Sequence, residues 1–202
     1  MGRHANVFLF PLHMPLPTDR AASLAIFCKV VDNYGDIGIC WRLARQLSGE
    51  HGVAVTLWVD DLPSFQRICP EVDVAAEAQH VSGVTVRHWR GQDGAFAPAD
   101  IADIADIVIE FFACDIPPGY IAAMAQCAPQ PVWLNLEGLT AEEWVEGCHA
   151  LTSPRRHDQA FLLPGFLPIK RAACCARRRS MKKGWHSRPM PASWRHSWGN
   201  SA

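Results

Sequence analysis

Apolar residues in this chain gather in short runs that are separated by polar turns. The first run, at 24–31, is almost entirely apolar, as expected for a strand that is buried on both faces of a sheet. Similar runs occupy 53–59, 106–112 and 131–136, and residues 84–89 alternate between apolar and polar side chains. The pattern therefore predicts a strand in each of these five segments.

Helical spacing is found between the predicted strands. Ile39, Leu43 and Leu47 recur every four residues, which predicts a helix over 39–47. Further helices are predicted over 64–68 and 119–127, and from the Thr-x-x-Glu capping box that begins at Thr140. Strands that alternate with helices over short connections indicate an α/β fold with a Rossmann-like parallel sheet.

Charge divides the chain into two parts. Residues 1–166 contain 10 Lys or Arg and all 20 Asp and Glu, whereas residues 167–202 contain 9 Lys or Arg and no acid. An acidic body suits a cationic partner and argues against nucleic acid as its main ligand. Beyond Phe166 no hydrophobic period persists, so we interpret 167–202 as an aberrant, unstructured basic tail from a shifted reading frame. A nucleic-acid-binding arm with stacking tryptophans is the alternative.

The start of the chain and its cysteines indicate the cellular compartment in which the protein is expected. Residues 1–23 are expected to be a disordered or mis-started extension, because prolines interrupt their apolar run and no cleavage site of a signal peptide follows. No apolar run is long enough to cross a membrane, so no membrane contact is expected. Most of the eight cysteines lie in apolar runs, as expected for reduced core thiols of a cytoplasmic protein.

The segment from Asp32 to Gly38 concentrates chemistry at the end of the first predicted strand, where open α/β sheets bind their ligands. It contains two carboxylates, Asp32 and Asp36, and two glycines, which let the backbone approach a ligand. From the residues alone, Asp36 could equally cap the helix and Asp32 could form the turn. The spacing matches neither G-x-G-x-x-G nor a P-loop, so a generic nucleotide-binding module is not favoured.

Longer motifs surround this segment. They are the run Phe27–Leu47, the run Leu57–Leu62, Asn135-Leu136-Glu137, the run Ala141–His149 and Pro164-Gly165-Phe166. Through these motifs residues 24–166 resemble the protein-arginine rhamnosyltransferases of the EarP type. A departure is Gly138, which stands where relatives usually have an aromatic residue.

The resemblance implies the N-terminal, acceptor-binding domain of a GT-B glycosyltransferase. It implies transfer of L-rhamnose from dTDP-β-L-rhamnose to an arginine of translation elongation factor P, with inversion. Asp36 would be the general base, and Asp32 would support it and orient the guanidine. No metal or cofactor is expected. The substrate-binding residues that we expect are Asn33, Tyr34, Gly35, Gly38 and Glu137, the last with a loop or capping role as the alternative.

These roles agree with elementary chemistry. A guanidinium is a poor nucleophile, because its lone pairs are delocalised and its pKa exceeds about 12. Carboxylates can hold it bidentately, and one of them can accept a proton as the bond to the sugar forms. The backbone N–H groups near Gly35 and Gly38 are the expected donors to the departing diphosphate.

The resemblance ends before the donor domain of the family, which holds a third catalytic carboxylate and the residues that grip the nucleotide. We therefore expect a truncated chain that is weakly active or inactive. Two alternatives stay open: a non-catalytic fragment that binds elongation factor P, and a generic nucleotide-binding Rossmann module.

If the basic tail replaces the donor domain, the purified chain should bind dTDP-β-L-rhamnose weakly. Half of an interdomain cleft cannot exclude water or clamp a diphosphate. Isothermal titration measures this affinity, and micromolar binding would contradict the expectation.

Overall fold

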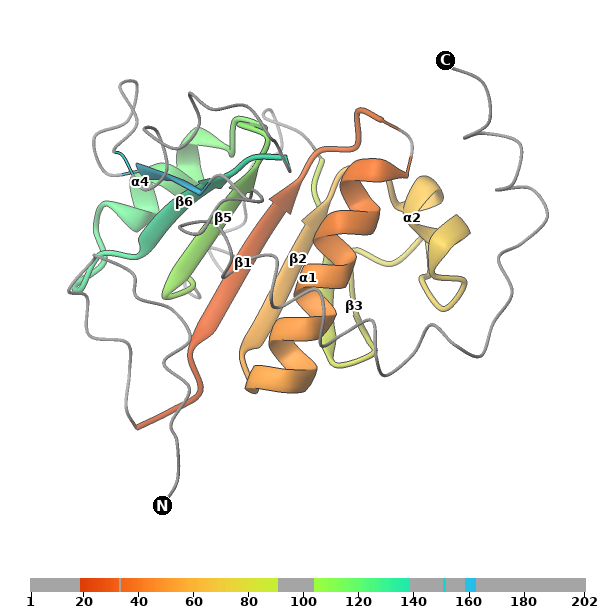
Figure 1. Cartoon of the computed structure of the whole chain (residues 1–202), viewed down its shortest axis with the longest axis horizontal. Coiled ribbons are helices and arrows are strands. Elements are labelled where there is room, and N and C mark those ends of the chain that lie inside the picture. Colours follow the sequence, from red (N-terminus) through yellow and green to blue (C-terminus); the bar gives the residue numbers. More distant parts are fainter. Residues whose placement is uncertain (1–18, 33, 91–103, 139–150, 152–158, 163–202) are drawn as a thin grey trace, which may run out of the picture.

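The computed structural model describes residues 19–32, 34–90, 104–138, 151 and 159–162. These residues form one seven-stranded sheet with helices packed against it (Figure 1). Along the chain the elements are β1 (Ser23–Cys28), α1 (Gly35–His51), β2 (Ala54–Val59), α2 (Leu62–Ile68), β3 (Ala78–Val81), β4 (Val84–His88), β5 (Ile107–Phe111), α4 (Pro118–Met124), β6 (Val132–Leu136) and β7 (Gln159–Leu162).

The strand order β3-β4-β2-β1-β5-β6-β7 places β1 near the middle of the sheet. All neighbouring strands are parallel except β3 and β4, which form an antiparallel hairpin. The chain proceeds outward from β1 to β2 and β4 and then returns to the other side of β1 for β5. The carboxyl ends of β1 and β5 therefore flank the topological switch point, where such sheets bind ligands. The expected α/β fold with a Rossmann-like, mostly parallel sheet is confirmed.

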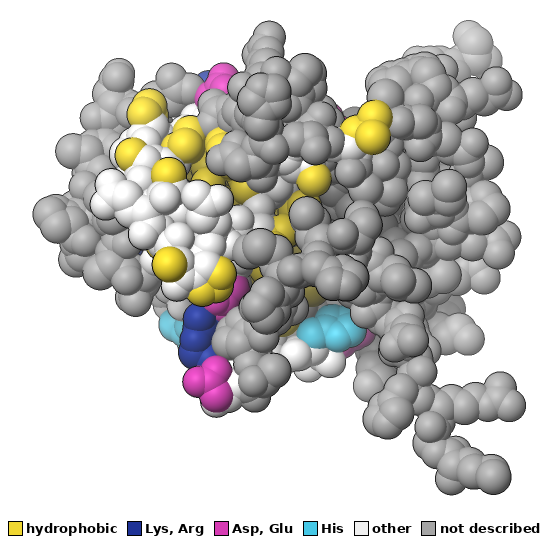
Figure 2. Space-filling model, turned by 90° about the vertical axis from the view of Figure 1, so that its left-hand side faces the viewer, with side chains coloured by type: hydrophobic (Ala, Val, Ile, Leu, Met, Phe, Trp, Pro, Cys, Tyr) yellow, Lys and Arg dark blue, Asp and Glu magenta, His cyan; other side chains and the backbone are white. Residues whose placement is uncertain are grey.

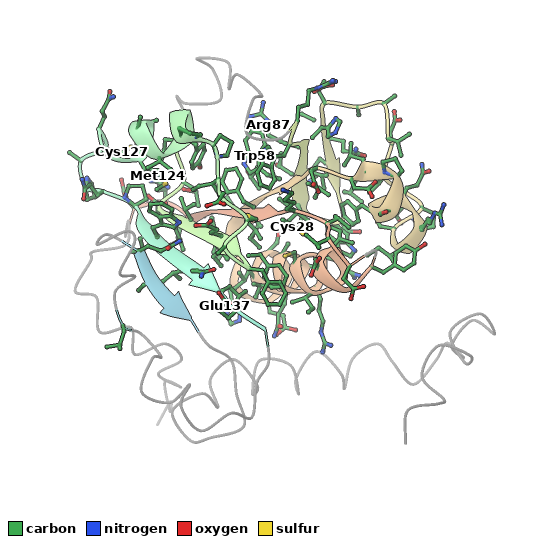
Figure 3. All side chains as sticks on the ribbon, turned by 90° about the horizontal axis from the view of Figure 1, so that it is seen from above. Cys28, Trp58, Arg87, Met124, Cys127 and Glu137 are labelled. Carbon is green, nitrogen blue, oxygen red and sulfur yellow. The ribbon has the colours of Figure 1, made fainter. Side chains whose placement is uncertain are left out.

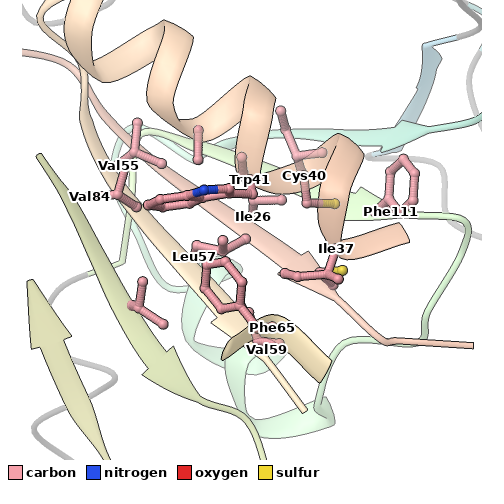
Figure 4. Close-up of a cluster of buried hydrophobic side chains, with 14 of the residues drawn as sticks. Ile26, Ile37, Cys40, Trp41, Val55, Leu57, Val59, Phe65, Val84 and Phe111 are labelled. Carbon is pink, nitrogen blue, oxygen red and sulfur yellow. The ribbon is translucent and has the colours of Figure 1, made fainter. Parts of the chain in front are cut away.

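The two faces of the sheet carry separate hydrophobic clusters, because side chains alternate along each strand. Ile26 and Leu57 face α1 and α2, where they pack with Trp41 and Phe65 (Figure 4). On the opposite face the ring of Phe27 packs among aromatic residues, and α4 contributes Tyr120 and Met124 to this cluster. There the guanidinium of Arg87 lies 4.7 Å from the ring centre of Trp58 (Figure 3).

Helix α1 differs from its prediction in two ways. It begins at Gly35 rather than at Ile39, so Asp36 and Gly38 belong to its first turns and not to a loop. Its buried apolar residues are Ile37, Cys40, Trp41 and Ala44, whereas Ile39 is 37% exposed. Ile39 lies off the buried stripe, and each four-residue step rotates the position by about 40° towards that stripe, because a helix turns in 3.6 residues rather than four. Leu43 and Leu47 only border the core.

Two strands escaped the sequence prediction. Strands β3 and β7 are four residues long and lie at the two edges of the sheet, where an apolar pattern is not required. The hairpin of β3 and β4 turns at Ser82 and Gly83, both with positive φ. The helix predicted from Thr140, the extension 1–23 up to residue 18 and the basic tail lie outside the described residues.

The surface in Figure 2 shows hydrophobic side chains between small groups of charged ones that lie near the upper and lower rims of this view. Across the described ranges, helices are too short or too polar to span a lipid bilayer.

The amino ends of β1 and β5 are joined by Asp106, which lies just before β5. Arg20 donates to both of its carboxylate oxygens, at 2.8 and 2.6 Å, and Ser23 donates to it from its amide and its hydroxyl group, both at 2.8 Å. Burial works to raise the pKa of Asp106, but the bonds from Arg20 and Ser23 outweigh burial and lower the pKa below its ordinary value of 3.8.

Asp106→Asn should therefore destabilise the domain by about 1–3 kcal/mol at neutral pH, since hydrogen bonds to a charged group are lost. A carboxyl group with a lowered folded pKa contributes stability above its unfolded pKa, and this contribution disappears as the pH falls through the folded value. Urea unfolding measured between pH 7 and pH 3 should show that the difference in unfolding free energy between the two proteins becomes smaller as the pH falls. Glu50→Gln, an exposed change on α1, is the control. A difference in unfolding free energy between Asp106→Asn and the unchanged protein that does not vary with pH would contradict the role of the charge.

Candidate active site

The candidate site lies in the turn between β1 and α1, at the carboxyl edge of the sheet. The Asp36 side chain is only 7% exposed and folds back onto the turn. Its Oδ2 atom accepts hydrogen bonds from the backbone N–H groups of Val31 and Asp32, both at 2.9 Å. The helix N-cap is Tyr34, whose side chain makes no capping bond. Asp36 thus fixes the turn that precedes the helix. An ordinary cap residue would instead accept the amides of the first helical turn.

A second carboxylate fixes the same turn from the neighbouring strand. Asp60 follows β2, and its Oδ1 atom accepts the N–H group of Val30 at 2.8 Å. Burial raises the pKa of Asp60, although this hydrogen bond opposes the shift. Three consecutive amides of the turn, at residues 30–32, are consequently held by carboxylate side chains.

Asp32 is exposed, in contrast to Asp36. Its carbonyl oxygen accepts the N–H group of Gly35 at 2.8 Å. A Cβ atom on residue 35 would lie 3.1 Å from the Oδ2 atom of Asp32, so glycine leaves room for this carboxylate. The structure therefore brings the two predicted aspartates together: one is buried and holds the turn, and the other is carried by that turn into solvent.

Reduced thiols lie beside Asp36. Burial raises the pKa of Cys40 well above its ordinary value, and a hydrogen bond with Cys28 and the nearby charge of Asp36 add to this shift. Burial and the charge of Glu110 likewise raise the pKa of Cys114. Thiols with raised pKa values stay protonated and are poor nucleophiles. The raised pKa values therefore argue against a cysteine nucleophile in this part of the molecule.

The other predicted site residues occupy different positions. The Tyr34 hydroxyl group accepts a hydrogen bond from Arg67 of α2 at 2.9 Å. The N–H groups of Gly35 and Gly38 donate to the carbonyl oxygens of Asp32 and Tyr34, so both amides are engaged within the turn and the helix. Asn33 lies outside the described residues.

Glu137 follows β6, two strands away from β1, at the same edge of the sheet. Its Oε1 atom accepts a hydrogen bond from Asn135 at 2.8 Å (Figure 3 labels Glu137). Asn135 and its register partner Glu110 on β5 are each only 2% exposed. Neither residue is among the site residues predicted from the sequence, although a polar residue within an otherwise apolar strand signals such a position.

Metal ligation has no candidate in this part of the chain. Within the described ranges, no group of three or more His, Cys, Asp or Glu side chains is arranged to hold an ion.

A mostly parallel α/β sheet with two carboxylates at its switch point is the class of domain in which ligands usually bind at the carboxyl edge. Comparison with known families makes this more specific. The model of the family described as Elongation-Factor P (EF-P) rhamnosyltransferase EarP matches residues 24–177. The chain belongs to this family.

Individual relatives agree with this assignment. A protein-arginine rhamnosyltransferase from Pseudomonas putida is 53% identical over 147 residues, which cover 72% of this chain and 37% of the relative. The Pseudomonas aeruginosa protein is 52% identical over 147 residues, covering 72% and 38%. The Shewanella oneidensis protein is 39% identical over 181 residues, covering 85% and 44%. The chain spans less than half of the length of these relatives, which fits the expected N-terminal half.

The different settings of the two aspartates predict different effects on stability. Asp36→Ala removes the acceptor of two backbone N–H groups and should cost about 1–3 kcal/mol of unfolding free energy, with faster hydrogen exchange at Val31 and Asp32. Asp32→Asn changes an exposed side chain and should stay within about 0.5 kcal/mol of the unchanged protein. Chemical denaturation and NMR-detected exchange measure both effects. Equal losses for the two variants would contradict the assignment of Asp36 as the residue that holds the turn.

Proposed function

We propose that this chain provides the acceptor-binding domain of a GT-B protein-arginine rhamnosyltransferase. In this proposal the enzyme transfers L-rhamnose from dTDP-β-L-rhamnose to an arginine side chain of translation elongation factor P, with inversion at the anomeric carbon. Membership of the family supports the reaction class, and the relatives, which are protein-arginine rhamnosyltransferases by name, support arginine as the acceptor. The observation that carries the proposal is the hydrogen-bonded turn that contains a buried and an exposed aspartate at the switch point.

Asp32 is the residue that meets the guanidinium. Its exposed carboxylate can form paired, charge-assisted hydrogen bonds with the planar group, which fixes the orientation of the attacking nitrogen. The backbone of Asp32 is held by Asp36, so the carboxylate is positioned before the acceptor arrives. Such preorganisation lowers the entropy that must be lost on binding.

Asp36 is the proposed general base. Its Oδ2 atom is engaged by two amides, and its Oδ1 atom has no hydrogen bond from the described residues. In the reaction the guanidinium nitrogen would form a bond to the anomeric carbon as the bond from that carbon to the diphosphate oxygen breaks. Asp36 would accept the proton that the nitrogen loses, and dTDP would leave with the electron pair of the broken bond.

The donor side belongs to the remainder of the proposed enzyme. Because Gly35 and Gly38 already use their amides within the turn and helix, we assign the described domain to the acceptor and not to the diphosphate. A cytoplasmic location fits this function, since the described cysteines are all free thiols.

Isothermal titration of the purified chain with elongation factor P tests the acceptor assignment. Asp32→Asn should weaken binding by about ten- to a hundredfold, because a charge-assisted hydrogen bond is lost, while its melting temperature stays the same. Glu50→Gln, which removes an exposed acid far along α1, is the matched control and should bind as the unchanged chain does.

The outcomes separate binding from chemistry. A complex that forms but gains no deoxyhexose mass in the presence of dTDP-β-L-rhamnose would support an acceptor-binding domain without activity of its own. The absence of any binding, or binding that is indifferent to Asp32, would overturn the proposal.

A further inference from the structure

The turn after β5 has an unusual backbone. Phe112, Ala113 and Asp115 have positive φ values of 53°, 47° and 56°. Residues with a side chain rarely adopt this left-handed conformation, and for a bulky residue such as phenylalanine it is an outlier. Strain of this kind persists where the surrounding structure enforces it, and it is concentrated at functional sites.

Two buried polar side chains enforce this conformation. Glu110 accepts the N–H group of Asp115 on its Oε1 atom at 2.8 Å and the side chain of Gln159 on its Oε2 atom at 2.5 Å. Asn135 accepts the N–H group of Ala113 at 3.0 Å. Both side chains are 2% exposed and project from strands of the sheet, so the turn is held by rigid elements.

The turn presents the ring of Phe112. This ring lies 4.3 Å from the ring centre of Phe111, and the Phe112 amide donates to the carbonyl oxygen of Leu136 at 3.1 Å. A Cβ atom on Gly138 would approach the ring to 2.9 Å, so the absence of a side chain at this position leaves room for it. The Phe112 side chain nevertheless remains 45% exposed, which a core residue would not be.

The turn after β5 lies next to the turn that carries Asp32, at the same edge of the sheet. Strand β5 borders β1, and the thiol of Cys114 donates to the carbonyl oxygen of Phe27 in β1 at 3.5 Å. Phe111 packs in the same cluster as Ile37 and Cys40 at the start of α1 (Figure 4). The turns after β1 and after β5 therefore stand on the two sides of the switch point.

We propose that Phe112 is a further acceptor-binding residue, whose ring stacks on the face of the guanidinium that Asp32 binds by its edge. This inference rests on the proposed function. A guanidinium has two recognition surfaces: its N–H edges pair with carboxylates, and its flat face stacks on aromatic rings. Glu110 and Asn135 are positioning residues, because they hold the strained turn and reach the acceptor only through Phe112.

Titration of the full chain with elongation factor P tests this inference through two variants of one residue. Phe112→Leu keeps an apolar side chain but removes the aromatic face, and should weaken binding by about three- to tenfold. Phe112→Trp keeps an aromatic face and should bind at least as tightly as the unchanged chain. In NMR spectra of the complex, the Cδ protons of the bound arginine should be shifted upfield by the ring, and this shift should be absent with Phe112→Leu.

Phe112→Gly is a second test of the role of the ring. Glycine adopts the positive φ without strain, so this variant favours folding of the turn. It should weaken binding at least as much as Phe112→Leu. Asp32→Asn is measured beside these variants. If the unchanged chain does not bind elongation factor P, the proposed function fails and this inference fails with it. If the chain binds and depends on Asp32 but is indifferent to Phe112→Leu and Phe112→Gly, only the inference about Phe112 is overturned.

Discussion

The site depends on one buried carboxylate oxygen. The Oδ2 atom of Asp36 accepts two consecutive amides, those of Val31 and Asp32, and so closes the turn between β1 and α1. A buried charge is tolerated only where hydrogen bonds replace its lost hydration, and these amides supply them. The same bonds leave the turn with one geometry. The exposed carboxylate of Asp32 is therefore carried on a fixed support, although the side chain itself lies in solvent.

Carboxylates accept hydrogen bonds from loop amides at two further places along the carboxyl edge of the sheet. Asp60 holds the amide of Val30 from the end of the neighbouring strand β2, and Glu110 holds the amide of Asp115 in the turn that follows its own strand β5. Loops at this edge would otherwise leave amides without partners, and carboxylates are strong acceptors for them. The negative charge that stabilises these loops also makes the edge attractive to a cation. The structural role of these acids and their proposed binding role thus have one physical origin.

Membership of the EarP family and the geometry of the edge lead to complementary conclusions. The family gives the class of chemistry to be proposed, and the structure distinguishes the two aspartates that the sequence presents as a pair. Asp36 is buried and serves the fold as well as the proposed proton transfer, whereas Asp32 is free to meet a partner. The chain spans less than half of the length of its relatives, and the acceptor side of the reaction is what we propose for it.

The sequence by itself determined the parallel sheet, five of its strands and the importance of the segment from Asp32 to Gly38, because these features follow from local hydrophobic runs and from motifs of neighbouring residues. It missed β3 and β7, since short edge strands need no apolar pattern, and it placed the start of α1 too late. Only the tertiary structure decided that Asp36 is buried and Asp32 exposed, and that Glu110, Asn135 and Phe112 belong to the same edge. Burial and the meeting of β1 with β5 depend on residues some 80 positions apart, as in the contact between Phe27 and Cys114 across 87 positions, and no local pattern encodes such contacts.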